Sequence, residues 1–392
     1  MGKNLPEQVS ALYSDIGRGH PNYLDSVLRM LRPKLEDTPE KLAVTSVFKE
    51  SHGFSRMAWK MVARMYRAGG RGGLVSRFYN NLRKNRKSSD RGGMIVKYLS
   101  RDLRRKYTGY DGVVLVAHPL LAQLLSDICR VWYVHGEIAW PVEFDLMRTE
   151  KIFVPLEITQ DRMLAAGLMS AQFEITGLVL EPEITSKNNE LLENRSRRIE
   201  AGREPTFAFF TSGAYPRAHQ EQIISAIGHI LTSRLGRVIL SAGCDHRMVN
   251  WMKGKLAEFN PEADIEKFNR NESKLIVFGL PERENLTLLE LSLLETADLI
   301  IMAAHERINW TVGLGFPTIL LTPDFGSFAP LNREFAREHG LLYDISNDDI
   351  RSGLDRFVQD YRARNKRLIF ETTKFGLEGA SRISDIIFKE LN

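Results

Sequence analysis

The residues of this chain that are best suited to chemistry follow short apolar runs of the kind that form buried strands. His20 closes the stretch SDIGRGH, which comes directly after the run Val9–Tyr13. Gly17 and Gly19 in this stretch allow a ligand to approach the backbone closely. An amphipathic segment begins at once, and the start of a helix offers N–H groups and partial positive charge to a phosphate or an oxyanion.

Three further polar residues follow apolar runs in the same half of the chain. His118 ends the run VVLVAH, and His135 and Glu137 follow the run VWYV. Parallel strands present their carboxyl ends at one edge of a sheet, so these residues are expected to converge with His20. Imidazole and a carboxylate of tuned pKa act as acid and base. His20, His118 and Glu137 are therefore candidate catalytic residues, and the alternative for His118 and His135 is a structural role.

No metal site is predicted at His20, His118, His135 and Glu137, because no close His–His or Cys–His spacing in this set supports one. Cys129 and Cys244 are far apart in the sequence, and we interpret them as small apolar side chains rather than as a disulfide. No cofactor is predicted.

The elements that must position these residues are buried strands that alternate with amphipathic helical segments, the pattern of a parallel sheet covered on both faces. We therefore predict an α/β protein with two doubly wound, Rossmann-like domains that face each other across a cleft. One series of strands is expected at Val9–Tyr13, Leu42–Val47, Gly112–Ala117, Val131–Val134, Lys151–Val154 and Glu174–Thr176. A second series is expected at Thr206–Phe210, Arg237–Ser241, Leu275–Phe278, Leu299–Met302, Thr318–Thr322 and Leu341–Tyr343.

The charged stretch Ser186–Pro205 separates the two series of strands. The first domain is predicted to span residues 1–180, with an insertion at 52–106, and the second domain residues 181–365. Residues 366–392 are helix-like and are expected to cross back to the first domain. A chain of 392 residues is long enough for two such cores.

Charge is distributed very unevenly along the chain. Residues 56–106 contain 16 Lys and Arg against two acids, a local charge of +14 within a total of +5. Apolar and basic residues alternate there, and Trp59, Lys60, Arg64, Arg67 and Arg71 are predicted to face an anionic membrane surface. The alternatives are a helix packed on the domain core with solvated cations, and a nucleic-acid surface, which we do not expect because no nucleic-acid module is recognisable.

Two features bear on location. MGKNLPEQVS lacks the apolar core of a signal peptide, and the most apolar stretch, Val113–Val134, contains His118, Asp127 and Arg130. We therefore expect a cytoplasmic protein that is held peripherally on the inner face of the membrane.

The order of motifs resembles the GT-B glycosyltransferases, in particular monogalactosyldiacylglycerol synthase, processive diacylglycerol glucosyltransferases and the lipid II N-acetylglucosaminyltransferase. The similarity covers about residues 9–345. The stretches that carry it are SDIGRGH, VLVAHPLLAQLL, KIFVPLEITQDRMLAAGLMSAQFEITGLVLEP, FFTSGAYPRAHQEQIISAI, VFGLPERENLTLLELSLLETADLIIMAA and GLGFPTILLTPDFGSFAPLNREFAREHG.

The resemblance implies a nucleotide-diphosphate-sugar donor, most simply a UDP-sugar, held by the second domain. One stretch departs from the family. MAAHERINWTVGLGFP replaces the glycine-rich turn for the diphosphate, with Arg307 in place of its threonine and Trp310 in place of its glutamate. Arg307 is then the candidate for the diphosphate charge. The donor-binding residues implied are Ser212, Gly213, Phe278, Gly279, Glu306, Arg307, Asn309, Thr311 and Asn332.

The function predicted from this resemblance is transfer of a sugar to a lipid or membrane-associated hydroxyl, without a metal, with Glu137 or His20 as the base. Two alternatives remain open. One is a nucleotide-sugar 2-epimerase of the same fold, and the other is a binding protein of this fold without catalytic activity, which the altered turn at Arg307 favours.

Overall fold

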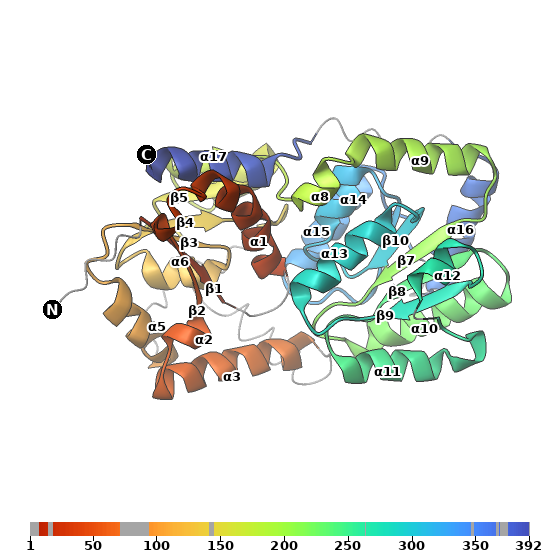
Figure 1. The fold of residues 1–392 in the computed structure, drawn as a ribbon, viewed down its shortest axis with the longest axis horizontal. Helices are drawn as coiled ribbons and strands as arrows, with labels where there is room; N and C mark the ends of the chain where they lie inside the picture. The colour runs from red at the N-terminus through yellow and green to blue at the C-terminus, as the bar shows by residue number, and fades with distance from the viewer. Residues whose placement is uncertain are drawn as a thin grey trace. The chain divides into compact units, whose positions relative to one another are not determined.

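The computed structural model of the chain describes residues 8–14, 19–70, 94–140, 145–262, 264–345, 349–365, 368 and 375–391, with the backbone alone at 66–70, 94 and 95. These residues form two compact domains (Figure 1). The first domain contains the chain up to Thr185 together with the segment from Phe375, and the second contains Ser186–Lys374.

The first domain is built on a six-stranded sheet in the order β2-β1-β3-β4-β5-β6, in which every pairing is parallel. Apolar side chains fill both faces of the inner strands, and Val113–Val116 is buried at every position, as expected of a strand covered on two sides. The strands are β1 (Val9–Tyr13), β2 (Leu42–Ser46), β3 (Val113–Val116), β4 (Arg130–Val134), β5 (Lys151–Val154) and β6 (Phe173–Ile175).

Helices cover both faces of this sheet. On one face, α1 and α17 pack against Ala11, Leu115 and Phe153. On the other face, α3, α5, α6 and α7 pack against Leu12, Val114 and Tyr133. The helices are α1 (Gly19–Leu31), α2 (Val47–Glu50), α3 (Gly53–Gly70), α5 (Met94–Tyr107), α6 (Pro119–Leu125), α7 (Glu157–Ala165), α8 (Pro182–Thr185) and α17 (Gly379–Leu391), with a 3-10 turn η1 (Arg32–Leu35) after α1.

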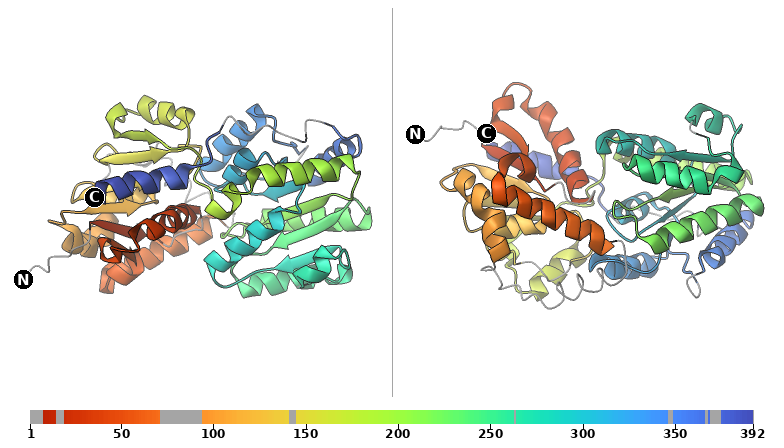
Figure 2. Two further views of the ribbon diagram at one scale, coloured as in Figure 1. Left: turned by 45° about the horizontal axis from the view of Figure 1, so that its top comes forward. Right: turned by 90° about the horizontal axis from the view of Figure 1, so that it is seen from below.

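The C-terminal helix α17 completes the first domain. Figure 2 shows it beside α1, and the two helices share one apolar core. The chain reaches this position through a close backbone contact: Leu178 N–H donates to the carbonyl oxygen of Gly376 at 2.7 Å. A side chain at Gly177, whose φ is +94°, would meet that same carbonyl. Arg130 of β4 adds ion pairs to Glu150 and to Glu390 of α17.

The second domain contains a five-stranded sheet in the order β11-β10-β7-β8-β9, again parallel throughout. Its helices α10, α11 and α16 pack on one face, against Phe209, Leu240 and Ile301. Side chains alternate along a strand, so Phe210 and Ser241 point to the opposite face. There they meet Trp310 of α14 and Glu290 of α13.

The strands of the second domain are β7 (Thr206–Phe210), β8 (Arg237–Ser241), β9 (Leu275–Phe278), β10 (Leu299–Met302) and β11 (Thr318–Leu320). Its helices are α9 (Asn188–Glu200), α10 (Arg217–Thr232), α11 (His246–Lys255), α12 (Ile265–Asn269), α13 (Arg283–Leu294), α14 (Ile308–Leu314), α15 (Phe328–Glu338) and α16 (Ile350–Arg362).

The predicted α/β class with two doubly wound, parallel sheets is confirmed. One predicted strand is wrong: at Leu341–Tyr343 the structure has an isolated bridge between Leu342 and Thr318. The short apolar run there follows helix α15 directly. Its residues Leu341 and Tyr343 are buried beside β11, but the pairing does not extend into a ladder.

The predicted membrane-facing role of Trp59 is also wrong. Trp59 is fully buried between α3 and α5, and its indole Nε1–H donates to the carbonyl oxygen of Leu99 at 3.1 Å. Lys60 and Arg64 are exposed on the same helix. Among the described helices, none combines the length and the apolarity that a bilayer crossing requires.

The packing of α17 predicts that its apolar face stabilises the first domain. Ile387 is fully buried, so Ile387→Ala should lower the free energy of unfolding by about 2–4 kcal/mol. Ile386 is only partly buried against the same core, so Ile386→Ala should cost clearly less. Denaturant unfolding measures both, and equal losses from the two substitutions would contradict this packing.

Candidate functional site

The strand orders define one switch point in each sheet, where adjacent strands send their connections in opposite directions. In the first domain it lies between β1 and β3, and in the second between β7 and β10. Open α/β sheets bind their ligands beyond the carboxyl ends of the strands at such points. The loops that follow these four strands are therefore the places to look for function.

At the switch point of the first domain, two imidazole rings face each other. His20, in the first turn of α1, lies 4.6 Å from His118, centroid to centroid, with a tilt of 58° between the rings. His118 is the N-cap of α6, and its Nδ1 accepts a hydrogen bond from Leu120 N–H at 3.1 Å. An accepting Nδ1 leaves Nε2 as the nitrogen of His118 that can exchange a proton. The structure thus brings two of the predicted residues together.

His135, after β4, has a different environment, because both of its ring nitrogens are used inside the fold. Nε2 lies 3.1 Å from the carbonyl oxygen of Ala139 and must donate to it, so Nδ1 accepts from the hydroxyl of Tyr133 at 2.9 Å. Burial, together with a smaller effect of the nearby His20, lowers the pKa of His135 to about 3. This neutral ring holds the loop between Val134 and Trp140 in place, which fits the structural alternative for His135.

Glu137 lies within that loop and is buried, 5% exposed. Burial raises the pKa of Tyr133 strongly, and the charge of Glu137 adds to this effect, which places the carboxyl group near the same buried hydroxyl. Gly136 fixes the loop against α1, since a Cβ there would lie 2.3 Å from the ring of Tyr23. Glu137 therefore lies near Tyr133, in the loop that His135 and Gly136 hold in place.

At the switch point of the second domain, Ser212 and Gly213 follow β7, as predicted for a ligand-binding loop. The hydroxyl of Ser212 is buried and has no hydrogen-bond partner among the described residues. Gly213 is exposed. Helix α10 begins just beyond, after Pro216, and no side chain caps it. A loop of this kind, with a hydroxyl and the start of a long helix, suits a phosphate group.

Arg307, in the turn after β10, is occupied by its own domain. Its Nη2 donates to Glu290 Oε2 at 2.5 Å, and the pair is almost fully buried, with side-chain exposures of 6% and 0%. The guanidinium also lies over the rings of Phe210 and Trp310, at 5.0 and 5.2 Å from their centroids. Glu290 accepts a second hydrogen bond from the hydroxyl of Ser241. The charge predicted to hold a diphosphate is thus neutralised within the domain.

Three other residues that were predicted to bind the sugar donor also have buried side chains. Asn309, Thr311 and Asn332 are buried, with exposures of at most 1%. The hydroxyl of Thr311 donates to Ile308 within α14, and the amide of Asn332 donates to the carbonyl oxygen of Ala304 at 3.1 Å. These contacts shape the turn after β10, and α15 supports it through Asn332. Glu306 lies in this turn and is half-buried.

Phe278 and Gly279, the remaining predicted donor residues, lie away from the switch point. Phe278 is the last residue of β9 and Gly279 follows it, and β8 separates β9 from β7. Phe278 is buried. A Cβ at Gly279 would lie 2.3 Å from the carbonyl oxygen of Gly243, so the missing side chain makes room for a neighbouring loop. Packing within the domain accounts for this glycine.

Two residues of the second domain were missed by the sequence reasoning. His219 is buried in the first turn of α10, with Nε2 at 2.9 Å from the carbonyl oxygen of Pro323, and burial lowers its pKa to about 4. Glu290 lies on the apolar face of α13, between Leu286 and Leu294. An acid among leucines at helical spacing is the signal that could have revealed a buried cationic partner.

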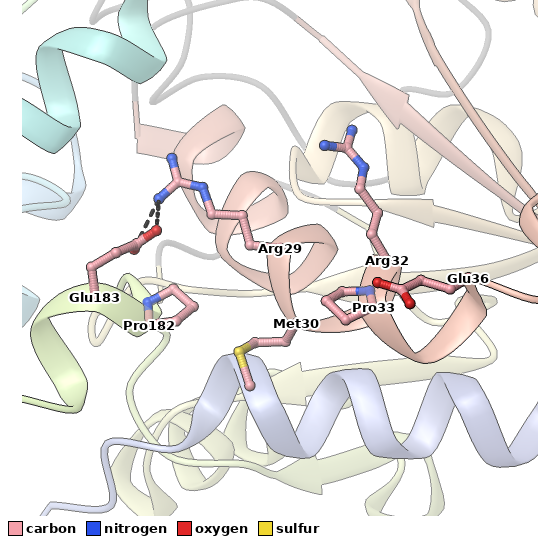
Figure 3. A pocket seen from close by; sticks show the side chains of 7 residues that line it. All are labelled: Arg29, Met30, Arg32, Pro33, Glu36, Pro182 and Glu183. Atoms are coloured by element: carbon pink, nitrogen blue, oxygen red, sulfur yellow. Dashed lines mark hydrogen bonds and ion pairs between the residues drawn. The ribbon is translucent and has the colours of Figure 1, made fainter.

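A surface hollow of about 610 Å³ lies on the first domain, lined by the end of α1, by η1 and by α8. In Figure 3 the side chains of Arg29 and Glu183 point toward each other, and two contacts of 3.1 and 3.0 Å join them. Arg32 and Glu36 are exposed at its rim. The hollow is open and its central charges are paired, so we assign no ligand to it.

Some predicted residues lie outside the described part of the chain, namely Gly17, Arg71 and the side chain of Arg67. Gly19 is the first residue of α1. Within the described residues, no group of three or more His, Cys, Asp and Glu side chains is arranged to hold a metal ion.

Solved structures with a similar fold match both domains. One is the UDP-GlcNAc 2-epimerase of Methanocaldococcus jannaschii in complex with UDP-GlcNAc and UDP (TM-score 0.54, 16% identity, 97% of this chain and 99% of that one). Another is the Neisseria meningitidis UDP-GlcNAc 2-epimerase bound to UDP-GlcNAc (TM-score 0.55, 12% identity, 97% of this chain and 99% of that one). A third is S. aureus MnaA with UDP (TM-score 0.56, 11% identity, 98% of this chain and 97% of that one). No protein-family model and no curated protein matches the sequence. At these identities the likeness shows the fold, which is GT-B-like.

These likenesses correct the function predicted from the sequence. Two of these neighbours are UDP-GlcNAc 2-epimerases with UDP-GlcNAc bound, and nothing in the comparisons supports the resemblance to glycolipid synthases or to the lipid II transferase. The glycosyltransferase function and its lipid acceptor are therefore wrong. A fold of this kind supports many reactions, so the motifs quoted above do not identify the reaction.

The buried, neutral His135 predicts that the first domain becomes less stable as the pH falls. An unfolded histidine titrates near 6.5 and the folded one near 3, so the unfolded chain binds a proton that the folded chain does not. The stabilisation is complete above pH 6.5 and falls as the pH is lowered, by about 1.4 kcal/mol per pH unit. In denaturant unfolding between pH 7 and 5, His135→Gln should remove this slope, whereas His52→Gln, at an exposed position, should keep it. An unchanged slope in His135→Gln would contradict the assignment.

The Arg307–Glu290 pair predicts that substitutions at these two positions have strongly coupled effects on the free energy of unfolding. Arg307→Met should destabilise the second domain by about 3–5 kcal/mol, because it leaves a buried carboxylate without its partner. Glu290→Gln added to Arg307→Met should restore most of this loss, since the amide still accepts from Ser241. Thermal or denaturant unfolding of the two single variants and the double variant gives the coupling energy. Additive losses would show that the two side chains do not form a buried pair.

Proposed function

We propose that this chain is a nucleotide-sugar 2-epimerase, with a UDP-N-acetylhexosamine as the substrate class. The observation that carries the proposal is the facing pair His20 and His118 at the switch point of the first domain, 4.6 Å apart. Support for the substrate comes from the UDP-GlcNAc and UDP present in the structures of similar fold. Both of those epimerases are matched over 99% of their length.

Epimerisation at one carbon requires that a C–H bond breaks and forms again on the opposite face of the sugar ring. C2 has no carbonyl neighbour, so the electron pair of its C–H bond must form a C1–C2 double bond while the C1–O bond to the diphosphate breaks. When a proton returns to C2 on the opposite face, the diphosphate returns to C1, and no second substrate is needed. Imidazoles suit the removal and return of a proton near neutral pH. In our proposal His20 and His118 exchange protons through their ring nitrogens. Glu137 supplies negative charge that stabilises an imidazolium, and the neutral His135 positions its loop.

The second domain is assigned the nucleotide diphosphate. Ser212 and Gly213, with the uncapped start of α10 behind them, are the groups that suit phosphate oxygens there. In our proposal the half-buried Glu306, in the adjacent turn, accepts hydrogen bonds from the ribose hydroxyls. Arg307 forms an ion pair with Glu290 and stabilises that turn. In our proposal, backbone N–H groups and hydroxyl groups therefore bind the phosphate oxygens, and the guanidinium does not.

A second candidate is a binding protein of this fold without catalytic activity. One specific observation favours it: Arg307, Phe210 and Trp310 pack together in the turn where a diphosphate was expected. Isothermal titration with UDP and with UDP-N-acetylglucosamine, followed by an activity assay, separates the candidates. Binding without turnover favours the silent protein, and binding with turnover favours the enzyme.

The proposed roles predict distinct effects for two substitutions of His118. With UDP-N-acetylglucosamine as substrate and proton NMR to follow the C2 epimer, His20→Ala and His118→Asn should each lower kcat by about 100-fold or more. Asparagine also caps helices, so His118→Asn should keep the stability that His118→Ala loses, about 1 kcal/mol. Full activity in both His20→Ala and His118→Asn would show that the pair does not carry the reaction.

A further inference from the structure

One face of α3 exposes a row of large apolar side chains that the proposed reaction does not use. The exposed fractions are 64% for Phe54, 60% for Met57, 43% for Met61 and 37% for Met65. The spacing of 3, 4 and 4 residues places these four on one side of the helix, within about one quarter of its circumference at 100° per residue. Tyr98 of α5, also exposed, extends the row beside Phe54, with ring centroids 6.3 Å apart.

The opposite face of α3 is fixed in the core, so this exposure is imposed by the fold. Trp59 is fully buried and hydrogen-bonded to Leu99 of α5, and Ala58 belongs to the same apolar cluster. α3 lies on the face of the β1–β6 sheet that does not contact α1 and α17 (Figure 1). The helix cannot rotate its methionines inward without removing an indole ring from the core, and the apolar row stays at the surface.

Cations lie along one side of the row. Arg56, Lys60 and Arg64 follow one another at intervals of four residues, and all three are exposed. Within the described part of the chain, none of the three forms an ion pair with a carboxylate. The three positive charges repel one another, which destabilises this surface, and an anionic partner nearby would remove that repulsion.

We propose that this row of α3, Phe54, Met57, Met61 and Met65 with Arg56, Lys60 and Arg64 at its side, docks on an anionic lipid surface. A helix with an apolar face and a basic flank lies in the plane of the headgroups, where the apolar side chains enter the acyl boundary and the cations stay with the phosphates. Methionine and phenylalanine side chains gain from that environment, and each cation adds attraction to an anionic leaflet.

Two other partners fit the same surface less well. A nucleic acid would meet the three cations but would leave the methionine row without a function, because phosphate contacts need no apolar neighbours. A second copy of the chain on a two-fold axis would place this row of cations near its own image. The docking is independent of the proposed reaction, whose substrate is water-soluble, and it is a property of α3 alone.

Flotation of the full chain with lipid vesicles tests the proposal. The probes are vesicles of phosphatidylcholine with phosphatidylglycerol, and vesicles of phosphatidylcholine alone. We expect the protein to float with the anionic vesicles and to remain unbound with the neutral ones. Met57→Ser with Met61→Ser should weaken partitioning about tenfold or more, and Lys60→Gln with Arg64→Gln should weaken it on the order of tenfold.

The matched control is Met147→Ser with Met169→Ser, at exposed methionines of the same domain, which should leave partitioning unchanged. Circular dichroism and thermal unfolding show whether each variant is folded. The proposal is overturned if the wild-type chain does not bind anionic vesicles, or if Met57→Ser with Met61→Ser binds as well as the wild type. It is overturned as well if light scattering shows a dimer that these two substitutions dissociate, or if a DNA duplex displaces the protein from the vesicles.

Discussion

Both domains depend on one constraint, the parallel pairing of every strand in the two sheets. Between two parallel strands the chain must cross back over the sheet, usually through a helix, before the next strand begins. The carboxyl ends of all strands therefore lie at one edge of the sheet, and their amino ends lie at the other. The loops after β1, β3 and β4 must therefore meet, and so must those after β7 and β10. His20 and His118, far apart in the sequence, become neighbours for this reason.

The two switch points use this constraint differently. In the first domain the meeting residues are imidazoles, and hydrogen bonds from Leu120 and Tyr133 set which nitrogens of His118 and His135 accept. In the second domain the meeting residues include an opposite pair of charges, Arg307 and Glu290, enclosed by aromatic rings. A buried pair of this kind stabilises the turn only while both partners are present. The switch point of the first domain thus presents titratable side chains, whereas in the second domain the charges of Arg307 and Glu290 neutralise each other.

Much of this arrangement was predictable from the sequence, because hydrophobic runs mark buried strands and parallel topology gathers the loops after those strands at one edge. His20 and His118 were found in this way. Arg307 was placed at the correct edge, but its partner Glu290 comes from a helix 17 positions earlier, and no local pattern pairs the two. Gly279 was predicted to lie in a donor-binding loop, but its missing side chain makes room for the carbonyl oxygen of Gly243. Trp59 looked like a membrane anchor because its helix is amphipathic on two sides, and only packing decides which side is buried.

The motifs quoted from the sequence do not identify the reaction, because one fold supports many reactions. The most direct measurement is the incorporation of deuterium at C2 of UDP-N-acetylglucosamine when the protein is incubated with it in D2O. If the histidines at the first switch point remove and return that proton, C2 gains deuterium, and the His20→Ala variant does not catalyse the exchange. A sugar that is bound at saturation yet keeps its original hydrogen at C2, with no epimer formed, would contradict the account.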